Sequence, residues 1–137
     1  MSPWILVHLV ATLIMVGIIW MVHWVHYPLM AHTGPTQSAM YQRQHVRRMG
    51  PLVIPVMLTE LISSVAICMN HPTPSAWTAL ALLIAIWAVT GLSSVPAHEE
   101  LSRGFHEASH RKLMTSNAIR TALWTARGVL AAAMVMA

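Results

Sequence analysis

Four apolar segments, each about as long as a membrane is thick, constrain the fold of this chain more than any other feature. They cover residues 3–27, 51–69, 76–95 and 114–136. A helix needs ~20 apolar residues to cross ~30 Å of hydrocarbon, and a backbone in lipid must satisfy its own hydrogen bonds. We therefore predict an all-α integral membrane protein, a four-helix antiparallel bundle that forms one transmembrane domain over residues 1–137.

The composition agrees with this class. The chain is 56% hydrophobic and 9% charged, whereas a soluble domain has roughly 25% charged residues. Eight Lys and Arg residues outnumber four acidic ones. A basic protein can bind nucleic acid, but these basic residues flank apolar segments, so lipid headgroups are the expected partner and nucleic acid is not. A single cysteine, Cys68, excludes an internal disulfide.

The basic residues outside the spans lie on one side of the predicted bundle. Because antiparallel spans alternate in direction, the connections 28–50 and 96–113 share one side of the membrane, and both termini share the other with the turn 70–77. The longer connections contain Arg43, Arg47, Arg48, Arg103, Arg111 and Lys112, and the opposite side has no Lys or Arg. The positive-inside rule therefore places the long connections in the cytoplasm and both termini outside.

The connection before the fourth span is expected to hold an amphipathic helix at the membrane interface. Residues 93–113 place acidic side chains in the first turns and basic side chains in the last, which suits the helix dipole. Leu101, Phe105 and Ala108 supply an apolar stripe toward lipid or the bundle.

The fourth apolar segment has polar side chains at the spacing of a single helical face. A charge at the centre of a bilayer costs from ~2.5 to more than ~10 kcal/mol, so this face is expected to point into the bundle. Arg120 can extend toward the cytoplasmic headgroups, whereas Arg127, about 20 Å inside the membrane, needs a partner. The residues of this face are Asn117, Arg120, Thr121, Trp124, Arg127 and Gly128.

Glu60 is the only acidic residue inside an apolar segment, and its position in the second span places it near the membrane midplane. Either charge alone in hydrocarbon would be strongly destabilising, so Glu60 is predicted to pair with Arg120 or Arg127. Two interpretations stay open. The pair either fixes the packing of the bundle or belongs to a site that binds or transforms a ligand.

Several histidines gather at the predicted cytoplasmic end of the bundle, among them His26, His45, His98 and His110. Neutral imidazole is the commonest protein ligand for transition metals, and helix bundles build metal sites from inward-facing His and Glu. These four residues are therefore candidate ligands for iron, copper or haem. Alternatively, histidines near an interface act only as hydrogen-bonding anchors.

The segment "HEASH", residues 106–110, matches the H-E-x-x-H pattern of zinc proteases. The segment is basic and interfacial, and the sequence marks no third ligand, so a metalloprotease is disfavoured.

Longer stretches resemble a known family: "VHYPL" (25–29), "YQRQHVRRMG" (41–50), "VPAHEELSRGFHEASHRKL" (95–113) and "NAIRTALWTARG" (117–128). They are similar to short four-helix bacterial membrane proteins that are loosely related to the anthrone-oxygenase-like membrane proteins. The resemblance implies the bacterial inner (plasma) membrane and oxidation of a polycyclic phenolic compound. Ala118 and His106 depart from the family pattern, which often has Trp and an acidic residue there. The recurrent polar positions that it implies are His26, His45, Glu60, His98, His110, Asn117 and Arg120.

The functional prediction is a polar pocket in the cytoplasmic half of the bundle that binds a small hydrophobic or quinone-like molecule, a metal or haem, in a membrane-bound oxidoreductase. Glu60, Arg120 and Asn117 are the predicted catalytic residues. Arg127 and Trp124 are predicted to contact a cofactor, and the four histidines to bind the metal. The alternative is a non-catalytic accessory subunit of a larger membrane complex, in which the same polar groups serve packing alone. The candidate protein partners are subunits of such a complex or further copies of the chain in a homo-oligomer.

Overall fold

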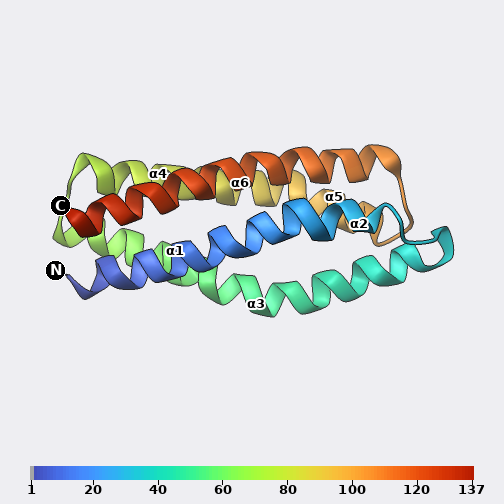
Figure 1. Ribbon diagram of the computed structural model, residues 1–137, viewed down its shortest axis with the longest axis horizontal. Helices are drawn as coiled ribbons and strands as arrows, with labels where there is room; N and C mark the ends of the chain where they lie inside the picture. Colours follow the sequence, from blue (N-terminus) through green and yellow to red (C-terminus); the bar gives the residue numbers. More distant parts are fainter. Residues whose placement is uncertain (1) are drawn as a thin grey trace.

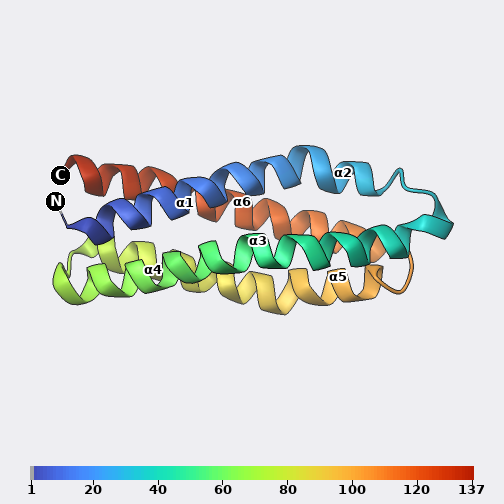
Figure 2. The same ribbon diagram turned by 90° about the horizontal axis from the view of Figure 1, so that it is seen from below.

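Residues 2–137 are described by a computed structural model, in which they form four long helices and no strands. The helical stretches lie side by side as an antiparallel bundle, with both chain ends at the same end (Figures 1 and 2). The predicted all-α class is confirmed, and each stretch is long and apolar enough to cross a membrane. The four stretches are Pro3–Met30, Pro35–Asn70, Pro74–Leu101 and Glu107–Met136.

A wide turn of π-helix interrupts the first and the third stretch. The first consists of α1 (Pro3–Met21), the π-helix η1 (Val22–His26) and α2 (Tyr27–Met30). The third consists of α4 (Pro74–Val89), the π-helix η2 (Thr90–Ser94) and α5 (Val95–Leu101). Single π turns inside α-helices occur frequently at functional sites. Both turns lie in the half of the bundle that carries the basic residues.

The second stretch is one helix, α3 (Pro35–Asn70), which continues through Pro51 and Pro55. Its 36 residues span about 54 Å at ~1.5 Å per residue, well beyond the ~30 Å of a hydrocarbon core. Of the expected polar connection over residues 28–50, the part from Pro35 onward is therefore helical and continuous with the second span. This part stays helical because it packs against α5: Gln42 is buried, and Arg43 donates to the carbonyl of Ser102 at 2.8 Å.

The expected amphipathic helix over residues 93–113 is wrong as a single element. Its first half forms the end of η2 and all of α5, and its last residues open α6 (Glu107–Met136). The turn between them contains Gly104 at a φ of +155°, a conformation that residues with side chains rarely adopt. The glycine ends α5, so the two halves do not form one helix.

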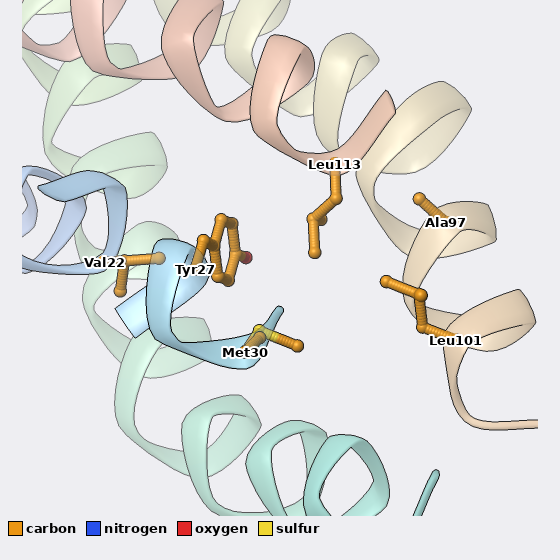
Figure 3. Packing of buried hydrophobic residues seen from close by; sticks show 6 residues of the cluster. All are labelled: Val22, Tyr27, Met30, Ala97, Leu101 and Leu113. Carbon is orange, nitrogen blue, oxygen red and sulfur yellow. The ribbon is translucent and has the colours of Figure 1, made fainter. Parts of the chain in front are cut away.

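Hydrophobic packing continues to the end of the bundle that carries the basic residues. A cluster of six buried side chains joins η1, α2, α5 and α6 there (Figure 3). It consists of Val22, Tyr27, Met30, Ala97, Leu101 and Leu113. The cluster holds these helix ends together at this end of the bundle.

Close contact between α1 and α6 depends on Gly128. A Cβ atom at this position would lie 3.2 Å from Cγ2 of Val16 and 3.8 Å from Cδ2 of Leu13. Small residues let helices approach closely in membranes. This approach brings the polar face of α6 against α1.

Candidate functional site

The polar face predicted for the fourth span points into the bundle. Helix α6 presents the six residues of this face as buried, including both arginines. Trp124, Arg127 and Asn117 are fully inaccessible, and Arg120 is 8% exposed. The spacing argument from the sequence is therefore confirmed for the orientation of this helix.

Glu60 and Arg127 form an ion pair in the middle of the bundle. Nη1 of Arg127 lies 2.8 Å from Oε1 of Glu60, and both side chains are 0% exposed. Thr12 Oγ1 donates to Oε1 at 3.0 Å, and Trp124 Nε1 donates to Oε2 at 3.1 Å. Both carboxylate oxygens are thus satisfied by donors from α1 and α6. Of the two arginines that the sequence offered, Arg127 is the partner.

The polar contacts of this pair continue toward the chain termini through His8. Its Nε2 lies 3.4 Å from Nη2 of Arg127, and its Nδ1 lies 3.2 Å from Oγ of Ser63. Sequence reasoning missed Thr12, His8 and Ser63, because single polar residues on apolar helices have no distinguishing pattern. Their contacts join α1, α3 and α6 in one buried network, which is the arrangement expected of a structural ion pair.

Arg120 has a different environment. Its Nη1 donates to Oγ of Ser94 at 3.1 Å, its guanidinium carbon lies 5.3 Å from the ring centroid of Trp124, and its buried Nε has no partner. Within residues 2–137, no carboxylate forms an ion pair with Arg120. The glutamates bond elsewhere: Glu60 to Arg127, Glu99 to Arg103, Glu107 to Arg111, and Glu100 to Ser109.

Three of the four predicted metal ligands come together from three different elements. The ring centroids of His26 and His45 are 4.3 Å apart at an interplanar angle of 25°, and those of His45 and His98 are 5.3 Å apart at 26°. The rings are therefore stacked. His110 lies apart from them, with its Nε2 2.9 Å from the backbone carbonyl of Tyr27.

This arrangement does not suit a metal ion. Stacked imidazoles present their faces to one another, whereas metal ligation needs nitrogens that converge on one point. Both ring nitrogens of His98 are engaged, Nε2 with the hydroxyl of Tyr27 at 2.9 Å and Nδ1 with the amide of Gln42. Throughout the described part of the chain, no group of three or more His, Cys, Asp or Glu side chains is placed to hold a metal. We therefore assign no metal ion to these histidines.

Tyr27, His98 and Gln42 form a hydrogen-bonded chain. A neutral imidazole donates from one nitrogen and accepts at the other. The buried Oε1 of Gln42 has no hydrogen-bond partner. Rotating the side-chain amide by 180° exchanges its oxygen and nitrogen, which have nearly the same shape, and brings Oε1 to Nδ1 of His98. In this arrangement His98 donates to Gln42 and accepts from the hydroxyl of Tyr27. In the other tautomer Gln42 donates to Nδ1, and Nε2 of His98 donates to the oxygen of Tyr27.

A cavity of about 320 Å³ lies where the two π turns and the proline-containing part of α3 face one another. Most of its wall is apolar, with Met15, Ile19 and Met57 among the side chains. Ser94 from η2 and Val22 from η1 both contribute to it. Its polar side chains are Tyr27, His45, Thr90, Ser94, His98 and Arg120.

The predicted catalytic and cofactor residues divide between the cavity and the ion-pair network. Arg120 lines the cavity, as do His45 and His98. Glu60, Trp124 and Arg127 belong to the ion-pair network instead. The amide nitrogen of Asn117 lies 3.4 Å from Nδ1 of His23, away from the cavity wall. Tyr27, Gln42 and Ser94 were missed, because only the tertiary fold shows what these neutral side chains contact.

Comparison of the chain with protein-family models, with curated proteins and with solved structures finds no match. The fold itself defines a class, a bundle of four helices that are each long and apolar enough to span a membrane. These helices suggest a multi-pass membrane protein.

Proposed function

We propose that this protein resides in the bacterial inner membrane with its basic end in the cytoplasm, and that the cavity binds a small amphipathic molecule with an anionic or electron-rich oxygen. Arg120 is the observation that carries the proposal. A buried charge without a counter-ion is costly, and Arg120 lines the cavity with an unpartnered Nε and no carboxylate nearby. An anionic ligand would supply the missing partner.

The position of the cavity in a bilayer supports an amphipathic ligand. Counting ~20 residues inward from the outer helix ends gives the inner boundary of the hydrocarbon. Arg120 then lies about 6 Å inside that boundary, and the stacked histidines lie just outside it. The boundary falls near His23, Gly50, Ser94 and Ser116. A ligand would place its polar group toward the headgroups and its apolar body toward Met15 and Met57.

The size and chemistry of the cavity restrict the ligand further. Its volume of about 320 Å³ is near the lower limit of the ~300–1,000 Å³ that is usual for ligand pockets, which favours one compact ring system or a short chain. Tyr27, whose hydroxyl is hydrogen-bonded to His98, can exchange a proton with a ligand oxygen. A phenolic or quinone-like molecule held by Arg120 meets all of these conditions.

The experiment compares two probes that share one ring system. Binding of 1-naphthoate, an anion, and of 1-naphthalenemethanol, its neutral analogue, is measured by calorimetry on the detergent-purified protein. We expect naphthoate to bind at least about ten times more tightly, and Arg120→Gln to remove that preference, since an ionic hydrogen bond is worth ~1.5–3 kcal/mol. Arg47→Gln is the matched control, because Arg47 is exposed and lies outside the cavity. Equal naphthoate affinity in the Arg120→Gln variant would refute the proposal.

A further inference from the structure

A second hollow lies on the outside of the bundle, separate from the cavity. This groove of about 420 Å³ runs between the η2 end of the third helical stretch and the first half of α6. It is lined by Val89, Ser93, Arg111, Lys112, Thr115 and Ile119, among others. Of its lining residues, none lines the Arg120 cavity.

The two ends of the groove differ in chemistry. Val89 and Ile119 form the apolar end, and Arg111 and Lys112 form the basic end. Along α6, Lys112 and Ile119 are about 10 Å apart at ~1.5 Å per residue. With the hydrocarbon boundary near Ser116, the apolar end lies among acyl chains and the basic end lies among headgroups.

Three of the polar side chains that line the groove are free to bind a ligand. Hydroxyl groups in this bundle commonly donate to the carbonyl four residues earlier, as in Thr90 and Thr121. Ser93, Thr115 and Lys112 differ, since none of them has a hydrogen-bond or ion-pair partner among residues 2–137. Two hydroxyls and an ammonium group form a donor set that suits a phosphate.

We propose that this groove binds one anionic phospholipid of the cytoplasmic leaflet. Its phosphate contacts Lys112, Ser93 and Thr115, and an acyl chain lies along Val89 and Ile119. A free phosphate would satisfy only the polar end and leave the apolar half without an occupant. The leaflet follows from the membrane orientation given under the proposed function, but the site does not depend on a ligand in the Arg120 cavity. Inner-leaflet electrostatics favour an anionic headgroup beside basic residues.

Native mass spectrometry tests the site on protein reconstituted with phosphatidylglycerol or with phosphatidylcholine. The expected result is one retained phosphatidylglycerol per chain and at least fivefold less retained phosphatidylcholine. The double variant Lys112→Gln/Thr115→Val should lose at least fivefold of the bound phosphatidylglycerol. A matched control, Arg47→Gln/Arg48→Gln, removes more charge from the same end of the bundle and should retain the lipid.

Three results would overturn the proposal: equal retention of the two lipids, unchanged retention in the groove variant, or an equal loss in the control, which would indicate general surface charge. Naphthoate binding is measured on the same preparations. A groove variant that loses lipid but binds naphthoate normally separates this site from the cavity. If naphthoate fails to bind while the lipid result holds, only the proposed cavity ligand is refuted.

Discussion

Arg127 and Arg120 are the same residue type two turns apart on one helix face, yet their surroundings give them opposite roles. Arg127 is paired with Glu60 and lies among donors and acceptors from α1 and α3. Arg120 faces a cavity, and its neighbours are the hydroxyls of Ser94 and Tyr27 and the ring of Trp124, none of which is a carboxylate. Because Arg127 has a counter-ion within the chain, it is part of the packing. Arg120 has no counter-ion and is therefore available for a ligand.

The first prediction concerns the carboxylate of Glu60. Glu60→Gln leaves Arg127 as a buried, uncompensated charge, which is expected to lower the free energy of unfolding by about 3–5 kcal/mol. Unfolding in mixed detergent micelles, followed by circular dichroism, measures this change. Naphthoate affinity should stay within about twofold, because Glu60 does not line the cavity.

Replacing both members of the ion pair is the control for that prediction. Glu60→Met/Arg127→Met removes both charges, and apolar replacement of a buried pair is often neutral. The double variant should therefore be more stable than Glu60→Gln alone. If Glu60→Gln were as stable as the unaltered protein but no longer bound naphthoate, Glu60 would be part of the ligand site and not of the packing.

Among the helices, α6 was the most predictable from sequence. Its polar residues recur at intervals of three and four. Because charged groups are unfavourable in lipid, this face of the helix is expected to point into the bundle. The π turn η1 was not predictable, because Val22–His26 contains no glycine or proline to mark a change of helix type. The helical form of residues 35–50 was not predicted, because arginines at 43, 47 and 48 resemble a solvated connection. In the structure they lie on α3, where Arg43 donates to the carbonyl of Ser102 at the end of α5 and Gln42 contacts His98 of α5.

The second prediction concerns the contact between α1 and α6. Gly128→Leu forces a side chain against Val16 and Leu13, and overpacking of this kind costs about 1–3 kcal/mol. Thermal unfolding in detergent measures the loss. Gly17→Leu is the matched control, since an added Cβ at Gly17 meets nothing within 4 Å. Equal melting temperatures for the two variants would show that α1 and α6 do not approach at Gly128.

At the scale of the whole molecule, charge is distributed unequally along the bundle. Six of the eight Lys and Arg residues lie between Arg43 and Lys112, outside the predicted spans, and none lies at the end with the two termini. The sequence therefore predicted the number of long helices and an orientation. It could not predict the cavity, because a void depends on how four separate helices bend past one another.

The third prediction tests that orientation. Single cysteines are introduced by His71→Cys and by His106→Cys in a Cys68→Ala background, at exposed turns on opposite ends of the bundle. In spheroplasts, a membrane-impermeant maleimide should label position 71 directly and position 106 only after permeabilisation, because basic connections stay in the cytoplasm. The reverse pattern would place the cavity and the lipid groove in the outer half of the membrane.

The length of α3 has a consequence for access. Its first 16 residues, 35–50, extend roughly four turns past the hydrocarbon boundary, and the cluster around Leu101 and Leu113 keeps the neighbouring helices beside it. In the proposed orientation this end of the bundle projects into the cytosol, and Arg120 lies about 6 Å inside the hydrocarbon boundary on the same side. An ionised ligand from the cytosol would therefore reach the guanidinium of Arg120 without crossing the centre of the bilayer.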